Sequence, residues 1–203
     1  MTKLLVSSTA AEPLQINISP FSPETITDEK FYEFCQKNSD LRIEQTAEGE
    51  IVVMPPAFSD EGNRNFKVLL EVGKWARKDG TGKGFDSSAG FTLPNGAKRS
   101  PDTSWIKLDR WSALSEKQKS SFAPICPDFV LELRSSSDTL SGLQDKMQEY
   151  IDNGAQLGLL VDPKNRTVHL YRPNQSPKIV KHPKAVDCSP ELPGFKLQMV
   201  RIW

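Results

Sequence analysis

The stretch DFVLELR at residues 128–134 decides how this chain is expected to fold. Its bulky and β-branched residues favour a buried strand. Because successive side chains of a strand point to opposite faces, Glu132 and Arg134 share one face. A carboxylate costs free energy to bury in so apolar a strand, so Glu132 needs a metal ion, an arginine or backbone donors as a partner.

Helices and strands alternate on both sides of this stretch. Helices are expected over residues 28–37 after the cap Thr27, from Ser59 or Asp60 to Asp79-Gly80, and from the cap Asp138 to about Asn153. Strands are expected over residues 42–44, 51–54, 85–93, 99–108, 157–162 and 167–172, and again in the tail. This order predicts one α/β (α+β) domain with a mixed β-sheet flanked by helices.

Two finer expectations follow from the same patterns. Residues 1–24, rich in Ser, Thr and Pro, are expected to form a flexible N-terminal arm, and residues 25–203 the single domain. In the second helix, the apolar stripe is expected at Phe66, Leu69, Leu70 and Gly73, which recur at helical spacing.

Composition narrows the class of protein. Lys+Arg and Asp+Glu both number 26, so the formal net charge is zero and a surface coated in basic charge is not expected. A local basic rim remains open, beside the simpler interpretation of a solvated helix face; it would use Lys67, Lys74, Arg77, Lys78, Lys83, Lys98 and Arg99. Three separated cysteines and two histidines argue against a zinc site and favour a reducing compartment. No apolar run is long enough for a signal peptide or a membrane span, so a cytoplasmic protein without a membrane partner is expected.

Two carboxylates in predicted strands suggest chemistry. Pro101-Asp102 precedes Glu132 by about 30 residues. Magnesium takes oxygen ligands, usually one or two carboxylates together with water and substrate phosphate. If the two strands are neighbours, Asp102 and Glu132 can hold such an ion, and Arg134 can contact the phosphate. The alternative interpretation is a structural ion pair between Glu132 and Arg134.

A longer succession of segments resembles a known family. The segments are LRIE at 41–44, GEIVVMPP at 49–56, RSPD at 99–102, CPDFVLELRSS at 126–136, KMQEYIDNGA at 146–155 and LLVDP at 159–163. Together they resemble the Uma-type restriction endonuclease family, formerly a domain of unknown function, within the PD-(D/E)xK nuclease superfamily. The resemblance covers roughly residues 24–200 and implies a restriction-endonuclease-like core.

The resemblance also implies roles for particular residues. Asp102 and Glu132 match the family's metal-binding aspartate and glutamate. Glu44 matches an early glutamate that would complete the magnesium site, either as a further ligand or as a group that contacts the ligands. Arg134 stands where the superfamily usually has lysine, and an arginine keeps its proton and cannot act as a general base. Lys146 matches a lysine on the following helix and would supply the amine; alternatively, it only flanks the apolar stripe and reaches for water.

These observations lead to a functional hypothesis and an alternative. The first is a Mg²⁺- or Mn²⁺-dependent endonuclease that hydrolyses phosphodiester bonds in nucleic acid, with DNA favoured, and in which Asp102, Glu132, Arg134 and Lys146 are the catalytic residues. The alternative is a catalytically inactive relative that binds nucleic acid or a protein. A homodimer would suit double-strand cleavage, and the sequence leaves the oligomeric state open.

Overall fold

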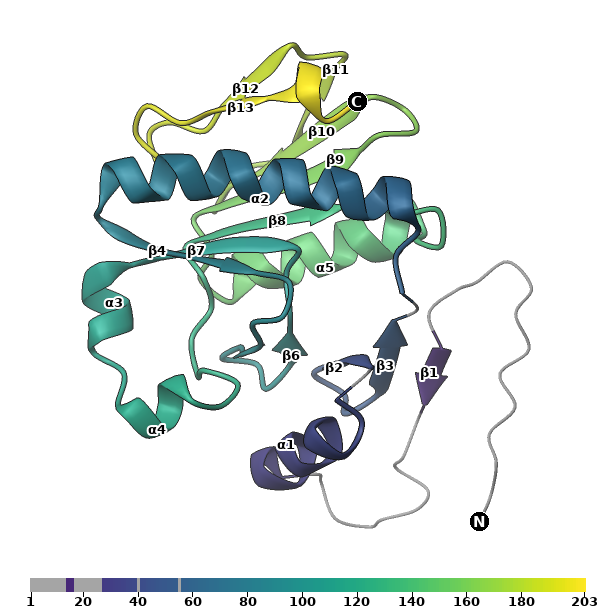
Figure 1. Cartoon of the computed structure of the whole chain (residues 1–203), viewed down its shortest axis with the longest axis vertical. Coiled ribbons are helices and arrows are strands. Elements are labelled where there is room, and N and C mark those ends of the chain that lie inside the picture. Colours follow the sequence, from purple (N-terminus) through teal and green to yellow (C-terminus); the bar gives the residue numbers. More distant parts are fainter. Residues whose placement is uncertain (1–13, 17–26, 40, 55) are drawn as a thin grey trace.

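The computed structural model describes residues 14–16, 27–39, 41–54 and 56–203 (Figure 1). The arm predicted for residues 1–24 lies outside the described residues, except for the short strand β1 (Leu14–Ile16). The described chain forms two large sheets and one two-stranded sheet, with three helices of ten or more residues packed around them. None of the helices in this described part has both the length and the apolar character that a membrane span requires.

A six-stranded mixed sheet is the centre of the molecule. Its strands lie in the order β11-β10-β9-β8-β7-β4. Their bounds are β4 Gly82–Asp86, β7 Thr103–Lys107, β8 Phe129–Leu133, β9 Leu157–Asp162, β10 Thr167–Tyr171 and β11 Lys178–Lys181. The pair β8–β9 is parallel and the other pairs are antiparallel. Every residue of β8 is buried, as the apolar stretch predicts.

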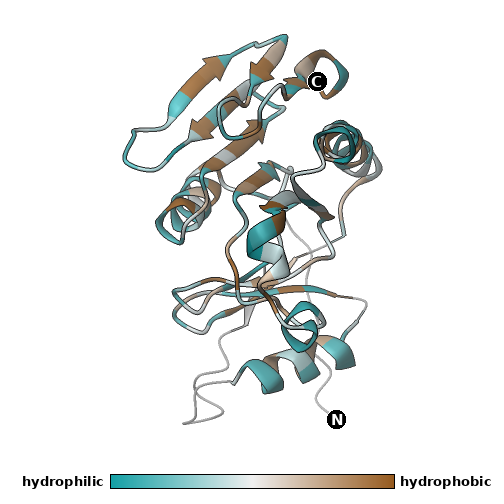
Figure 2. Cartoon of the chain, turned by 90° about the vertical axis from the view of Figure 1, so that its left-hand side faces the viewer, coloured by the Kyte–Doolittle hydropathy of each residue, from teal (hydrophilic) through white to brown (hydrophobic). Residues whose placement is uncertain are grey.

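Two long helices cover opposite faces of this sheet. Helix α2 (Ser59–Asp79) packs on the face of Leu131, and helix α5 (Leu140–Asp152) packs on the face of Val130. Figure 2 shows the hydrophobic strands between these helices, whose outer surfaces are hydrophilic. The mixed sheet flanked by helices is therefore confirmed.

The stripe predicted for α2 is wrong. Its buried residues are Val68, Val72 and Ala76, whereas Phe66 is 62% exposed and Leu70 is also exposed. Both rows are apolar at helical spacing, and the row of smaller side chains lies against the sheet. Periodicity alone does not distinguish two such rows, because the choice depends on which sheet surface the helix covers.

A second, antiparallel sheet has five strands in the order β1-β3-β2-β6-β5. Its other strands are β2 Arg42–Gln45, β3 Ile51–Met54, β5 Phe91–Thr92 and β6 Lys98–Arg99. Helix α1 (Asp28–Lys37) packs on it through the buried Phe31. The expected cap Thr27 accepts a hydrogen bond from the amide of Lys30 at 3.3 Å.

The chain crosses between the two sheets where continuous strands were predicted. The strand predicted for 99–108 is divided into β6, in the five-stranded sheet, and β7, in the six-stranded sheet. The strand predicted for 85–93 is likewise divided into β4 and β5. Local alternation does not reveal such crossings, because both halves have strand character. Asp102 lies at the first of them, directly before β7.

Short elements complete the fold. They are α3 Leu108–Ser112, α4 Glu116–Lys119, the strands β12 Ala185–Asp187 and β13 Lys196–Gln198, and the 3₁₀ helix η2 Met199–Arg201. The hairpin β12–β13 packs through Val186 and Leu197 into the core beneath α2. The start of α5 differs from prediction, because Thr139 is the cap and Asp138 instead accepts a hydrogen bond from the amide of Ser135.

Candidate active site

Asp102 and Glu132 lie on neighbouring strands. Thr103 pairs with Leu131 in the antiparallel register of β7 and β8, and the next step along this register places Asp102 opposite Glu132. Residues opposite each other in an antiparallel pair point to the same face. The amide of Leu133 also donates a hydrogen bond to Oδ2 of Asp102 at 2.9 Å. The adjacency on which the predicted carboxylate pair depends is therefore present.

Lys146 connects Glu132 to a third carboxylate. From the middle of α5, its Nζ lies 2.9 Å from Oε1 of Glu132 and 2.9 Å from Oε1 of Glu44. One turn later, the hydroxyl of Tyr150 donates to Oε1 of Glu132 at 3.0 Å. Lys146 thus points into the site, and the interpretation that it only reaches for water is wrong.

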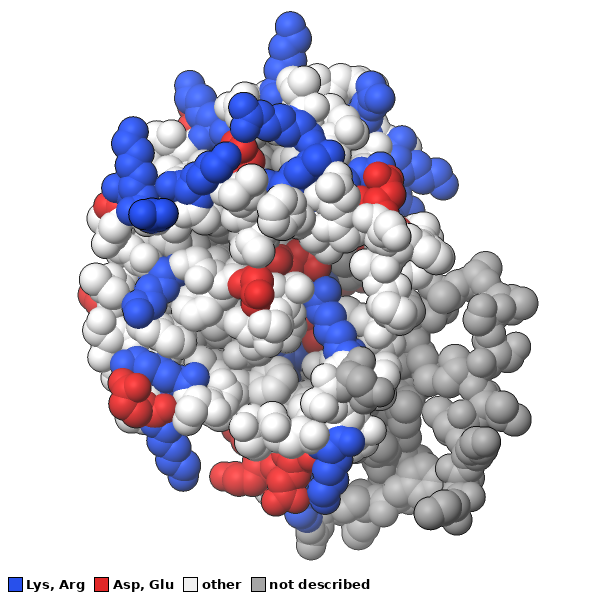
Figure 3. Space-filling model, viewed as in Figure 1, with Lys and Arg blue, Asp and Glu red and all other residues white. Residues whose placement is uncertain are grey.

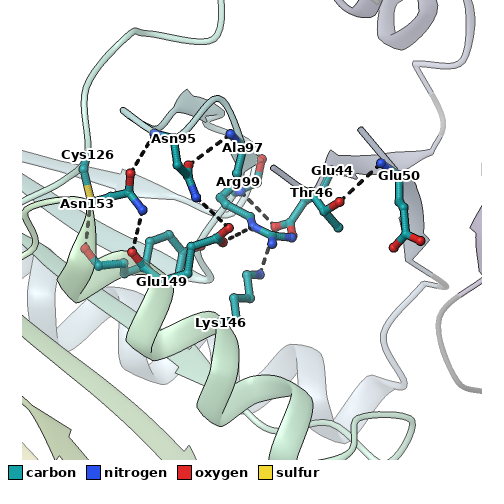
Figure 4. A network of polar contacts seen from close by, with 12 residues as sticks. Glu44, Thr46, Glu50, Asn95, Ala97, Arg99, Cys126, Lys146, Glu149 and Asn153 are labelled. Atoms are coloured by element: carbon teal, nitrogen blue, oxygen red, sulfur yellow. Dashed lines mark hydrogen bonds and ion pairs between the residues drawn. The ribbon is translucent and has the colours of Figure 1, made fainter. Parts of the chain in front are cut away.

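Glu44 anchors the five-stranded sheet to the site. It lies on β2 and is buried, and its oxygens accept hydrogen bonds from the amide of Ser100 at 2.9 Å and from Arg99 at 3.3 Å. Arg99 also donates to Glu149 of α5 at 2.6 Å. Figure 4 shows Arg99 and Lys146 between Glu44 and the helix, so that this network joins the smaller sheet to α5.

The pKa values of the two glutamates that contact Lys146 are shifted in opposite directions. Burial alone would raise the pKa of Glu44, but Lys146, Arg99 and the Ser100 amide outweigh it and hold that pKa below its ordinary value. Burial raises the pKa of Glu132 to about 7, and the neighbouring carboxylates add to this against the attraction of Lys146. The difference arises because Glu44 has two cations within 3.3 Å and Glu132 has one.

Arg42 and Lys146 supply the positive charge around the carboxylate pair. A guanidinium nitrogen of Arg42, on β2, lies 3.1 Å from Oδ1 of Asp102. Burial would lower the pKa values of Arg42 and Lys146, but the carboxylates around them outweigh it and raise both. Both side chains are therefore cations at neutral pH.

Arg134 has a different partner from the one that the alternative interpretation gave it. Its guanidinium NH1 donates to the buried Asp162 at 2.8 Å, and its Nε donates to the carbonyl of Asp138 at 3.3 Å. The interpretation of a structural pair between Glu132 and Arg134 is therefore wrong. Asp162 ends β9, the parallel neighbour of β8, which places it beside Arg134 in the register.

A cavity of about 350 Å³ opens onto these side chains. It is lined by Asp102, Glu132, Lys146, Arg42 and Arg134 together with Met54, Pro56, Ala57, Phe58, Glu61, Arg64, Asn65, Leu133, Ser135, Ser137, Asp138 and Leu143. Of the five residues predicted for the site, four line this cavity, and Glu44 lies behind Lys146.

The donor set of the cavity is compatible with a hard divalent cation held by two carboxylates. Asp102 and Glu132 offer carboxylate oxygens to one volume, which together with water and a phosphate is a usual magnesium environment. Within the described part of the chain, no group of three or more His, Cys, Asp or Glu side chains is arranged to hold a metal ion. The role of Glu44 as a third ligand stays a prediction.

The chain was compared with known proteins on this basis. The family model described as "Uma2: Putative restriction endonuclease" matches residues 28–200. The chain belongs to the Uma2 family. This membership confirms the resemblance drawn from the sequence segments and supports a nuclease.

A solved structure shares the Uma2 fold seen here. It is described as a putative nuclease belonging to DUF820 from Anabaena variabilis. The superposition covers 79% of this chain and 88% of the Anabaena chain, with a TM-score of 0.68. The sequences are 20% identical, so the similarity establishes the fold, which is the restriction-endonuclease-like core expected. Among curated proteins, none matches the chain.

Several residues around the Uma2 site were not predicted as site residues. They are Arg42, Arg99, Glu149, Tyr150 and Asp162. Only Tyr150 could have been found from the sequence, because it follows Lys146 by four residues and therefore shares its helix face. The other four reach the site through pairings between distant segments, which a single sequence does not display.

The predicted basic rim is only partly present. Lys98 and Arg99 are largely buried in ion pairs with Asp28 and with Glu44 and Glu149, so they do not belong to a surface rim. Lys74, Arg77, Lys78 and Lys83 are exposed on α2 and β4. Figure 3 shows Lys and Arg side chains gathered over α2 and the C-terminal strands on this face of the molecule.

Proposed function

We propose that this protein is an endonuclease that hydrolyses phosphodiester bonds in DNA with Mg²⁺ or Mn²⁺ held by Asp102 and Glu132. The observation that carries the proposal is the placement of these carboxylates on paired strands, opening together onto one cavity. The family's description as a restriction endonuclease favours DNA. The basic side chains over α2 also suit a phosphate backbone.

The cationic side chains that line the cavity suit the negative charge that develops on the phosphate during hydrolysis. A bound divalent ion would polarise the phosphoryl oxygen and lower the pKa of a water molecule. Lys146 and Arg42, both held as cations, would stabilise the negative charge that develops on the phosphate. Arg134 uses NH1 and Nε within the protein, and its remaining nitrogen, NH2, can donate to a phosphate oxygen.

The test is cleavage of plasmid and single-stranded DNA in Mg²⁺ or Mn²⁺. Asp102→Asn and Glu132→Gln each remove a ligand charge at constant size and are expected to lower cleavage by at least a hundredfold. The matched control is Glu48→Gln, an exposed glutamate in the β2–β3 turn, which should cleave as the wild type does. Metal-dependent cleavage that survives both site variants would refute the assignment of the ligands.

One observation favours a second function, a binding module without catalysis. The ammonium of Lys146 already lies against Glu44 and Glu132, and it neutralises them without a metal ion. In that case DNA is retained in gel-shift assays, with no cleavage at any metal concentration. Metal titration by calorimetry separates the two functions, since a binding module would take up no Mg²⁺ or Mn²⁺ at this site.

A further inference from the structure

The cavity extends beyond the carboxylates into a largely apolar pocket. Its apolar lining comes from the end of β3 and the start of α2 on one side, and from β8 and α5 on the other: Met54, Pro56, Ala57, Phe58, Leu133 and Leu143. Phosphate binding needs none of these groups. An apolar pocket beside a phosphate site suits the flat face of a nucleobase.

Phe58 and Asn65 give this pocket the features of a base-binding subsite. Phe58 is 71% exposed at the start of α2 while it borders the cavity, so its ring is available for stacking. Asn65, two helical turns further on, has a buried Oδ1 with no hydrogen-bond partner among the described residues. A buried acceptor without a partner costs free energy, which an N–H group of a bound base would recover.

The walls of the pocket are held together by the protein itself. Glu61 accepts a hydrogen bond from the amide of Phe58 at 3.1 Å, and its other oxygen accepts one from the amide of Ser136 at 2.8 Å. The start of α2 is thereby joined to the loop after β8. This bridge is made by groups of the protein alone, so it holds two walls of the pocket at a fixed separation.

The size of the pocket selects its occupant. A cavity of about 350 Å³ lies at the small end of the range for ligand sites, roughly 300–1,000 Å³. Such a volume takes one nucleotide unit and excludes a base pair with its two backbones. A base inside a duplex would have to leave its stack to enter.

We infer that the pocket takes one unstacked nucleobase, packed against Phe58 and hydrogen-bonded by Asn65, next to the phosphate at Asp102 and Glu132. This inference rests on the proposed function, because it takes the neighbouring carboxylates as the phosphate site. It names the substrate class as DNA that is single-stranded or locally unpaired at the nucleotide bound beside the scissile phosphate.

The first test measures binding apart from cleavage. Fluorescence anisotropy in EDTA compares a short labelled single strand with the same strand carrying abasic sites, so that the phosphates are unchanged. The wild type is expected to bind the base-bearing strand about tenfold more tightly, as one stacked base implies. Phe58→Ala and Asn65→Ala should each reduce this ratio several-fold, and equal binding of both strands by the wild type would overturn the inference.

Matched controls come from the same helix. Phe66→Ala removes an aromatic ring that is 62% exposed, and Asn63→Ala removes an exposed amide. Neither residue lines the cavity. Both controls should keep the wild-type ratio. If they lower it as much as the pocket variants do, the base is bound along the outer surface of α2 and the pocket assignment is overturned.

The second test uses cleavage in Mg²⁺ or Mn²⁺ of a single strand, a gapped duplex and a fully paired duplex. Cutting of the first two at least tenfold faster than the paired duplex supports the inference. Equal cutting of all three overturns it, while loss of cutting in Asp102→Asn would still support the proposed function. Base-dependent binding without any cleavage supports the subsite and rejects the catalytic proposal.

Discussion

At the scale of single residues, Glu132 is distinguished by the balance of charge around it. Four carboxylates and three cations meet here: Glu44, Asp102, Glu132 and Glu149 with Arg42, Arg99 and Lys146. With every group ionised, one negative charge is in excess. The effect is greatest at Glu132, where burial raises the pKa to about 7 and the charges of Asp102 and Glu44 add to the rise.

This raised pKa predicts a pH dependence of stability. In the metal-free protein between about pH 4.5 and 7, folded Glu132 keeps a proton that the unfolded chain has lost. The free energy of unfolding should therefore decrease as pH rises through this window, by on the order of 3 kcal/mol over its whole width.

Glu132→Gln isolates that effect, because glutamine does not titrate. Urea denaturation in EDTA at pH 5 and pH 8 is expected to show the variant gaining stability relative to the wild type as pH rises. Asp152→Asn, at an exposed position on α5, is the control and should show no relative change. A relative stability that stays constant with pH would mean that Glu132 titrates in its ordinary range.

At the scale of elements, the sequence predicts the helices and strands that are determined by their own residues. It does not predict features that depend on distant segments of the chain. Strand β8 and helices α1, α2 and α5 follow from their own residues, with ends displaced by two residues or fewer. The divided strands around Asp86 and Ser100 do not, because the sheet that each half joins depends on distant partners. Arg134 illustrates the same limit at the site, since its partner Asp162 lies 28 residues away.

The ends of β8 and β9 depend on the pair formed by Arg134 and Asp162. Burial would raise the pKa of Asp162, but hydrogen bonds from Asn165 and Arg134 outweigh it and lower that pKa. The stabilisation is thus present above the ordinary pKa of an aspartate and is lost in acid. Asp162→Asn leaves Arg134 without its carboxylate and should cost about 3 kcal/mol of unfolding free energy at pH 7.

Denaturant titration of Asp162→Asn measures this cost. Wild-type stability at pH 7 would show that the ends of the two strands are held by their backbone ladder alone.

At the scale of the whole molecule, the site is where the two sheets meet α5. Arg99 is one of two connections, beside Lys146, because it links Glu44 of the smaller sheet to Glu149 of the helix. Arg99→Met keeps much of the side-chain length but leaves both carboxylates short of a donor. We expect a loss of about 3–5 kcal/mol in unfolding free energy, and hydrogen exchange should rise first in β2 and β6.

The same variant has a matched control. Arg201→Met also removes an arginine paired to a glutamate, but the side chain of Arg201 is 65% exposed, so its pair with Glu71 should contribute less than 1 kcal/mol. Equal losses in the two variants would show that Arg99 acts as an ordinary surface charge rather than as a connection between the smaller sheet and α5.

The ammonium of Lys146 lies between Glu44 and Glu132 and serves as a counter-ion for both carboxylates. A nuclease whose acidic groups repel one another depends on its metal for integrity as well as for chemistry. Here the side chain of Lys146 supplies that positive charge, so we expect the fold to stay intact under chelation, which on the proposed function would stop cleavage. Metal supply would then act as a reversible control of activity, and metal-starved molecules would stay folded and resist proteolysis until the ion returns.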